Sequence, residues 1–355
     1  NSIIGNDIGG GYSELTCTRF GLYLYGSSNN ILRSNNIVRC VYNFGVWGFN
    51  LSEFINDIDT SNTVDGKPVY YWINKQDRTV PEDAGYVALI NCTRITVQNL
   101  ALAKNEQGIL LAYTTNSTIT QNTITNNEDG IHFIWSSNNS ITRSTITLNY
   151  WHGIRLDNSF DNSIVENSIT NNGHAADIFA GSGVALYESS NNNISRNDIK
   201  NNLGAGISLW ESSQNNIVSN NITNNAHGIS LLNSSCNSIV GNNITNNGFL
   251  YPPYEMSGIS LWESSQNNIV SNNIANNAEG IEIYNSSNNK IYHNHFTNNI
   301  KQVSIREEVP GSANVWDDGY PSGGNWWSDY IGDDFFRGPY QNVTGSDNRG
   351  DTPYI

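Results

Sequence analysis

The segment GISLWESSQNNIVSNNI runs from Gly206 to Ile222 and recurs without change from Gly258 to Ile274. It is one unit of a longer repeat, in which a glycine returns at intervals of 22, 23 or 30 residues. The shared pattern is G-I-x-L-x-x-S-S-x-N-x-I-x-x-N-x-I-x-N-N, and its glycines are Gly108, Gly130, Gly153, Gly183, Gly206, Gly228, Gly258 and Gly280. Self-similarity at a fixed period is typical of a solenoid.

Apolar and polar residues alternate within each unit in short runs. Ile207 and Leu209 form one run, while Ile217 and Ile222 belong to the next two. This alternation is typical of β-strands, and the Ser, Asn and Gly residues between the runs turn the chain readily. Three short strands and three corners in about 22 residues predict one coil of an all-β fold, a single-stranded parallel β-helix.

Equivalent residues of successive coils lie above one another in such a stack, ~4.8 Å apart. The Ile positions then form a dry interior. An Asn that recurs once per coil predicts an asparagine ladder, in which side-chain amides bond along the stack. Its members are Asn127, Asn149, Asn172, Asn202, Asn225, Asn247, Asn277 and Asn299.

The repeat divides the chain into four segments. Residues 1–53 read as N-terminal coils, 54–84 as a non-repeat insertion with a hairpin-like excursion, 85–305 as regular coils and 306–355 as a C-terminal cap. The two longest intervals predict loops near 173–182 and 248–257. A cap is needed because unpaired strand edges invite aggregation. Its aromatic cover is predicted to be Trp316, Trp326, Trp327, Phe335 and Phe336, and the N-terminal end shows no comparable cap.

Charge and hydropathy exclude two classes of partner. The net charge is -15, from 32 Asp and Glu against 17 Lys and Arg. Nucleic acid and anionic lipid are disfavoured, because phosphate binding needs clustered Lys and Arg. No apolar run approaches the ~18 residues of a transmembrane helix. The sequence begins inside a repeat unit, so we expect that an N-terminal piece, such as a signal peptide, has been removed and that the protein is extracellular or on the cell surface.

The sequence contains ten candidate sequons and four cysteines. The predicted glycosylation candidates are Asn50, Asn91, Asn116, Asn138, Asn193, Asn221, Asn233, Asn243, Asn285 and Asn342. Cys17 and Cys40 lie 23 residues apart, close to one coil, and are predicted to form a disulfide between neighbouring coils. Cys92 and Cys236 occupy one repeat position several coils apart and are predicted to fill space.

The repeated coils are similar to those of a known family. Two flanking segments share the likeness: IDTSNTVDGKPVYYWIN before the coils, and GGNWWSDYIG with GDTPYI after them. Together they resemble the NosD-like family of right-handed parallel β-helix proteins, whose repeats are also described as carbohydrate-binding and sugar-hydrolase repeats, in its archaeal cell-surface form. The resemblance implies a right-handed helix. The family name also implies copper delivery, but the one Met, four Cys and six His show no copper-ligand spacing.

An aromatic column is predicted on the outside of the coils, four positions after each glycine. The residues at this position are Ala112, Ile134, Asp157, Tyr187, Trp210, Leu232, Trp262 and Tyr284, and the next position adds Glu188, Glu211 and Glu263. One interpretation is a glycan track, in which rings stack on sugars and carboxylates accept hydroxyl hydrogen bonds. A second is a protein interface. In the third, the two loops, with Tyr251, Pro252, Pro253 and Tyr254, fold over the column.

A second cluster is predicted on the same face. His132 and Arg155 both lie two positions after their glycine, so they are expected to be neighbours, with Asp157 close by. Asp129, Glu106 and His152 share this register. Epimerisation or cleavage of an acidic sugar needs a base and a cation at the sugar carboxylate, which His132 and Arg155 would supply. The alternative is a set of exposed charges bonded to one another.

Two other chemistries have weaker signals. Carboxylates of the Glu column would satisfy the ~5–9.5 Å separation of a glycosidase pair, but so would any acidic ladder. The Asp-Pro-His-Glu run of β-helix alginate epimerases is absent. Asp333, Asp334, Asp347 and Asp351 are weak calcium candidates, and no cofactor is required.

These features together predict a structural or adhesive protein of the cell surface or of a sheath. Self-association into an assembly such as a filament is expected, from the uncapped N-terminal coil and the aromatic column. Contact with polysaccharide or cell-envelope glycans fits the same face. The alternatives are a polysaccharide lyase, epimerase or hydrolase, and a non-catalytic carbohydrate-binding module.

Overall fold

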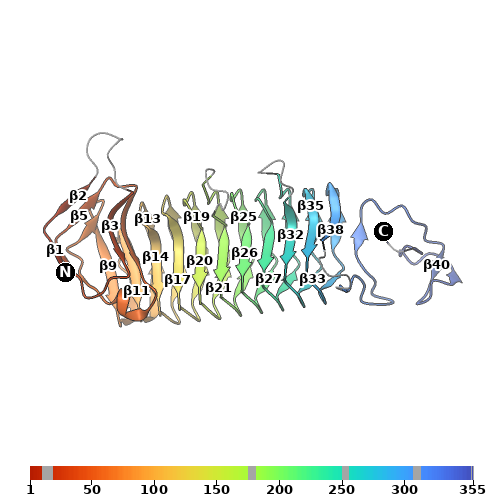
Figure 1. Cartoon of the computed structure of the whole chain (residues 1–355), viewed down its shortest axis with the longest axis horizontal. Coiled ribbons are helices and arrows are strands. Elements are labelled where there is room, and N and C mark those ends of the chain that lie inside the picture. The colour runs from red at the N-terminus through yellow and green to blue at the C-terminus, as the bar shows by residue number, and fades with distance from the viewer. Residues whose placement is uncertain (10–18, 175–180, 250–255, 307–312, 353, 355) are drawn as a thin grey trace.

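The strands stack into one elongated solenoid, with the N-terminal coils at one end and the C-terminal segment beyond the other (Figure 1). The computed structural model describes residues 1–9, 19–174, 181–249, 256–306, 313–352 and 354. Within these ranges, all strand pairings are parallel except β8 with β9 and β40 with β41. The predicted all-β, parallel β-helix is therefore confirmed. No helix among the described residues is long and apolar enough to cross a membrane.

Each regular coil contributes one strand to each of three sheets. The long sheet contains 14 strands: β2 (Asp7–Gly9), β5 (Asn36–Val38), β8 (Thr63–Val64), β9 (Lys67–Ile73), β11 (Tyr86–Ile90), β14 (Gln107–Ala112), β17 (Asp129–Ile134), β20 (Ile154–Asp157), β23 (Val184–Tyr187), β26 (Ile207–Trp210), β29 (Ile229–Leu232), β32 (Ser257–Trp262), β35 (Glu279–Tyr284) and β38 (Lys301–Arg306).

The second and third sheets contain 10 strands each. The second sheet consists of β10 (Gln76–Thr79), β12 (Thr93–Gln98), β15 (Thr118–Thr120), β18 (Ser140–Thr142), β21 (Ser163–Val165), β24 (Asn193–Ser195), β27 (Asn216–Val218), β30 (Ser238–Val240), β33 (Asn268–Val270) and β36 (Lys290–Tyr292). The third consists of β13 (Ala101–Ala103), β16 (Thr123–Thr125), β19 (Thr145–Thr147), β22 (Ser168–Thr170), β25 (Asp198–Lys200), β28 (Asn221–Thr223), β31 (Asn243–Thr245), β34 (Asn273–Ala275), β37 (His295–Thr297) and β39 (Trp326–Trp327).

The interior is a stack of aliphatic side chains. Ile207 pairs in register with Ile229, and Ile217 pairs with Ile239; all four are fully buried. Complete burial of such a side chain contributes about 1.5–3 kcal/mol. The repeated Ile and Leu positions therefore account for most of the driving force that closes each coil.

Asparagine ladders hold the corners. Asn225 represents the predicted ladder: its backbone N–H donates to Asn247 Oδ1 at 2.9 Å, and its own Oδ1 accepts from the Asn202 N–H at 3.0 Å. This ladder is confirmed. Two further ladders occupy the other corners and run through Asn162, Asn192, Asn215, Asn237, Asn267 and Asn289, and through Asn167, Asn197, Asn220, Asn242, Asn272 and Asn294.

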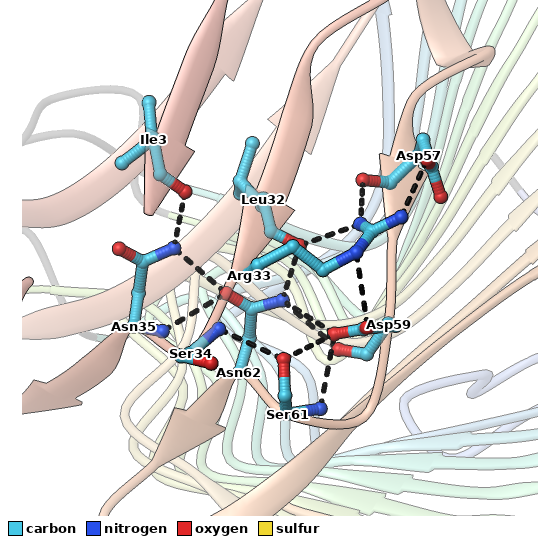
Figure 2. A network of polar contacts seen from close by, with 9 residues as sticks. All are labelled: Ile3, Leu32, Arg33, Ser34, Asn35, Asp57, Asp59, Ser61 and Asn62. Carbon is cyan, nitrogen blue, oxygen red and sulfur yellow. Dashed lines mark hydrogen bonds and ion pairs between the residues drawn. The ribbon is translucent and has the colours of Figure 1, made fainter. Parts of the chain in front are cut away.

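The N-terminal coils have corners of the same kind. Their strands β1 (Ser2–Ile4), β4 (Ile31–Arg33) and β7 (Asp57–Ile58) form a small sheet. Figure 2 shows the Asn35 side chain donating to Asn62 Oδ1 at 2.8 Å. Beside them, the Arg33 guanidinium joins the carboxylates of Asp57 and Asp59 (Figure 2). The short 3-10 helix η1 (Leu51–Phe54) follows the second of these coils.

A pair of N-terminal strands covers the outer face of the long sheet. These are β3 (Phe20–Tyr25) and β6 (Tyr42–Trp47), which pair with each other. Their apolar side chains share a second buried core with outward-facing residues of the long sheet, among them Ala112 and Ile134. Ala112 and Ile134 face outward from the coil, as the sequence pattern predicts, but the covering pair buries them.

The C-terminal segment closes the last coil with part of its predicted aromatic set. The Trp327 ring stacks on Phe296 with centroids 4.4 Å apart, and Trp316 also packs against the main core. Trp326, Phe335 and Phe336 are exposed and do not contribute cover. Beyond the cap, β40 (Phe336–Arg337) and β41 (Val343–Thr344) pair antiparallel.

Candidate functional site

A pocket of about 510 Å³ lies where the covering pair meets the long sheet. Three polar contacts hold the two parts together: the Asn43 N–H donates to Lys104 O, the Glu106 N–H to Phe44 O, and the Gln107 side chain to Val46 O. The pocket is lined by Arg19, Tyr23, Tyr25, Trp47, Phe49, Glu106, Glu128, Asp129, Tyr150, Trp151 and Arg155.

Three carboxyl groups from two neighbouring coils enter this pocket. Asp129 pairs with Gln107 in register, so Glu106 and Glu128 lie at equivalent positions, each one residue before that pair. Glu106 is 6% exposed, and its Oε2 has no hydrogen-bond partner. Burial, reinforced by the charges of Asp129 and Glu128, raises the pKa of Glu106 well above the usual range. Burial in the pocket therefore favours the protonated form of this carboxyl group.

The other two carboxylates have cationic partners. The Arg19 guanidinium contacts Glu128 at 2.5 Å. Burial still raises the pKa of Glu128, against the opposing effect of Arg19. Asp129 accepts a hydrogen bond from the His152 backbone N–H at 2.9 Å, and Arg155 lies 3.9 Å from its Oδ2. The carboxyl groups thus have different environments, as acid and base partners require.

The structure brings the predicted trio of His132, Arg155 and Asp157 together. His132 Nε2 lies 2.7 Å from Asp157 Oδ2, and Arg155 Nε lies 3.0 Å from the same oxygen. His132 is fully buried against the Trp47 ring and does not line the pocket, so its role is to hold Asp157. Arg155 lines the pocket.

Arg155 is held between two aromatic rings. Its guanidinium carbon lies 4.9 Å from the Trp47 ring centre and 5.1 Å from that of Tyr187. Burial lowers the pKa of Arg155, but the nearby Asp129 and Asp157 charges more than offset this, so the net shift is upward. Arg155 therefore remains a fixed cation at the edge of the pocket.

His152 supports the pocket from behind. Its Nδ1 accepts from the Ser182 N–H at 2.9 Å, and its Nε2 lies 3.2 Å from the Tyr187 hydroxyl. Burial lowers the pKa of His152 to about 4, so the imidazole is neutral at neutral pH. With Nδ1 accepting, Nε2 carries the proton and donates to Tyr187.

The aromatic column begins at Tyr187 and leads away from the pocket. The long sheet places Tyr187, Trp210, Leu232, Trp262 and Tyr284 in one register. Trp210 and Trp262 are 47% and 44% exposed. Leu232 separates the column into two ring pairs, Tyr187 with Trp210 at 6.3 Å and Trp262 stacked on Tyr284 at 4.1 Å.

The Glu residues beside the column are exposed. Glu188, Glu211 and Glu263 each have φ near +48°, which places them at the corner that follows the strand. The Trp210 indole N–H donates to Glu211 Oε1 at 3.3 Å. The residues Tyr251, Pro252, Pro253 and Tyr254, proposed to cover the column, lie outside the described residues.

The remaining site predictions fall outside the pocket. Cys40 is buried, and its predicted partner Cys17 lies outside the described residues. Every predicted glycosylation Asn is exposed or half-buried. Asp334 and Asp351 accept backbone N–H groups of the C-terminal segment. Among the residues that the structure describes, no group of three or more His, Cys, Asp or Glu side chains could hold a metal ion.

Sequence reasoning named Glu106 and Asp129 only as neighbours of His132 and missed Glu128 and Arg19. The sequence does contain a pattern that could have identified Glu106, Asp129 and Glu128. In two successive coils the stretch from the Asn to the Gly reads NEQG (residues 105–108) and NEDG (residues 127–130), so a Glu directly follows the Asn in both. No comparable pattern marks Arg19, because its contact with Glu128 depends on how the N-terminal strands fold back.

Comparisons with solved structures find other β-helices at low sequence identity. A mutant of the periplasmic alginate epimerase AlgG matches with a TM-score of 0.57 and 15% identity, over 84% of this chain and 73% of that chain. The Dettilon tailspike protein matches with a TM-score of 0.52 and 17% identity, over 88% and 62%. A DFA-IIIase from Arthrobacter chlorophenolicus A6, without its lid, matches with a TM-score of 0.52 and 13% identity, over 82% of this chain and 72% of that chain.

Sequence comparison identifies the family. The search of curated proteins found no significant match. The sequence model of the right handed beta helix region matches residues 73–222 and 182–312, which together span more than half of the chain. The chain therefore belongs to the right-handed β-helix family.

Proposed function

We propose that the protein is a glycoside hydrolase, and that the pocket beneath the covering pair is its active site. The observation that carries the proposal is the carboxyl group of Glu106, which is buried in an aromatic-lined pocket with one oxygen unpartnered. A group of this kind is costly to bury without a use, and perturbed pKa values cluster at functional sites.

Hydrolysis of a glycosidic bond needs one protonated and one ionised carboxyl group on either side of the bond. Glu106, with its raised pKa, is the proton donor to the leaving oxygen. Asp129 comes from the next coil, ~4.8 Å along the stack, and acts on the anomeric carbon directly or through a water. Arg155 and the His152 N–H hold Asp129 in place.

The rest of the pocket fits a sugar ring. Aromatic side chains, the kind on which sugars stack, line it: Tyr23, Tyr25, Trp47, Tyr150 and Trp151. Relatives in fold support a carbohydrate role, since the alginate epimerase is named for a polysaccharide. The fold likeness alone does not select the reaction; the carboxyl groups of the pocket do.

Chemistry on an acidic sugar fits the pocket less well. A lyase or epimerase needs a cation for the sugar carboxylate. Both arginines that line the pocket are already matched by carboxylates, Arg19 by Glu128 and Arg155 by Asp157. Among the described residues that line the pocket, no positive charge is therefore left unpaired to bind an acidic substituent.

A surface role is the second candidate. The half-exposed rings of Trp210 and Trp262 favour an association face, as a self-assembling cell-surface or sheath protein would need. Self-association, an extracellular location, glycosylation and the NosD-like, archaeal cell-surface relationship remain predictions. A monodisperse monomer at high concentration would count against the structural role and leave the enzymatic one untouched.

The test of hydrolysis is Glu106→Gln, which keeps the side-chain shape and removes the acid. Turnover of glycans by the wild-type protein would be followed by release of reducing ends. We expect the variant to lose about 10²–10⁴-fold in kcat while it still binds substrate. Glu166→Gln is the matched control, because Glu166 is exposed beside Arg143 and Arg196, away from the pocket. Full activity of the Glu106 variant would overturn the assignment.

A further inference from the structure

The outer face of the long sheet is acidic and aromatic beyond the pocket. From β23 to β35, the strands of this sheet and the residue after each contain no Lys or Arg. They carry five carboxylates, namely Glu188, Glu211, Glu263, Glu279 and Glu282. The first basic residues of this sheet beyond them are Lys301 and Arg306 in β38.

This face continues directly from the pocket. Arg155 lines the pocket and contacts the Tyr187 ring, and the Tyr187 ring contacts Trp210. Between the column and the glycines, the floor is made of small residues: Ala185, Ser208, Ser230 and Ser260. An extended ligand that leaves the pocket along the solenoid axis therefore meets aromatic rings and carboxylates in turn.

A buried carboxyl group stands at each end of this face. At one end is Glu106 in the pocket. At the other end is Glu279, which is 1% exposed and whose Oε1 lies 3.6 Å from the Arg306 guanidinium. Burial and the neighbouring Glu282 raise the pKa of Glu279. The sheet thus carries more carboxyl groups than cations from β23 to β35, and three of these carboxyl groups, on Glu188, Glu211 and Glu263, are exposed.

We propose that the substrate is a polysaccharide whose sugars carry free amino groups. This inference rests on the proposed hydrolase function and names its substrate class. Ammonium groups would pair with Glu188, Glu211 and Glu263 and lie over the faces of Trp210 and Trp262, where cations are attracted to aromatic rings. A polyuronate would instead meet like charge on this face and on a chain of net charge -15.

Binding to the inactive Glu106→Gln variant tests the substrate class without cleavage. The probes are oligosaccharides of glucosamine, of N-acetylglucosamine and of galacturonate at equal length. Three exposed carboxylates predict roughly tenfold tighter binding of the glucosamine probe than of the acetylated one, and the preference should fall as salt rises. The galacturonate probe should bind most weakly.

Neutralisation of the column carboxylates by Glu188→Gln, Glu211→Gln and Glu263→Gln together should abolish the preference for the free amine. Glu82→Gln, Asp161→Asn and Glu166→Gln together form the charge-matched control, because these exposed residues lie outside the long sheet. The control should keep the preference.

Equal binding of the amino and acetylated probes would overturn the substrate class, even if the wild-type protein hydrolyses a neutral glycan. Tight binding of polylysine with no preference among the sugars would also overturn it, and would assign the face to a basic protein. If the amino preference holds while Glu106→Gln still cleaves, the hydrolase assignment fails and the binding assignment stands.

Discussion

Glu106 packs directly against Gly45: a Cβ on Gly45 would lie 2.4 Å from the Cβ of Glu106. The covering pair can approach the long sheet this closely only because Gly45 has no side chain. The same approach buries the Glu106 carboxyl and raises its pKa. A backbone contact between distant parts of the chain therefore creates the acid on which the proposed chemistry depends.

Gly45→Ala should push the covering pair away from the sheet. We expect a loss of about 1–3 kcal/mol in the free energy of unfolding from overpacking, together with reduced turnover. Denaturant unfolding measures the first and reducing-end release the second. Because the clash is with the Glu106 Cβ, the double variant Gly45→Ala, Glu106→Gly should be more stable than the sum of the single changes predicts. Simple additivity would show that the two residues do not meet.

Arg19→Gln should move the alkaline limb of the pH–activity profile to higher pH. The Arg19 charge lowers the pKa of Glu106 and Glu128, so its removal raises both. Glu106 acts as the protonated acid, and activity is lost as the pH rises through its pKa. A higher pKa therefore extends activity upward in pH. The measurement is kcat/KM against pH, with the exposed Arg196→Gln as control. An alkaline limb that stays at the same pH or moves to lower pH in Arg19→Gln would contradict the role of Glu106 as proton donor.

Asn225→Ala should destabilise the solenoid more than its size suggests. Asn225 Oδ1 accepts from both the backbone N–H and the side chain of Asn202, each at 3.0 Å, and these donors would be left buried and unpaired. The expected cost is about 2–4 kcal/mol, read from denaturant unfolding. Its neighbour Asn224 is exposed with φ near +56°, so Asn224→Asp keeps the corner and should change stability by less than about 0.5 kcal/mol.

The coil could be predicted from the sequence because each repeated residue meets a requirement within its own coil or the next one. Ile217 faces the interior, and Asn215 forms hydrogen bonds with the coils on either side. Trp210 departs from what the coil requires, and its side chain is exposed on the outer face. The pocket could not be predicted in this way. The pocket forms where the Glu106 N–H donates to Phe44 O and where the Arg19 guanidinium pairs with Glu128. These contacts join residues that are not related by the repeat, so its period cannot predict them. The pocket carboxyl groups follow a pattern in the sequence. The strand pair β3 and β6, which covers them and so creates the pocket, follows none.

Two histidines, the buried His152 and the half-buried His227, should make the fold acid-sensitive. His152 and His227 both accept a backbone N–H at Nδ1, from Ser182 and Ser257 respectively. Burial lowers the pKa of each to about 4, below the unfolded value near 6.5. Between these values the unfolded chain binds more protons than the folded one. Stability should therefore be fully present above about pH 6.5 and fall as the pH drops toward 4.

The loss assigned to His152 alone is on the order of 3 kcal/mol at pH 4, which denaturant unfolding at a series of pH values would resolve. His227→Asn separates the two residues, because an amide oxygen can accept the Ser257 N–H without titrating. In that variant the slope of stability against pH between about 4 and 6.5 should be shallower than in the wild-type protein, with turnover unchanged because His227 lies outside the pocket. A slope equal to that of the wild type would show that His227 is not held neutral by the fold.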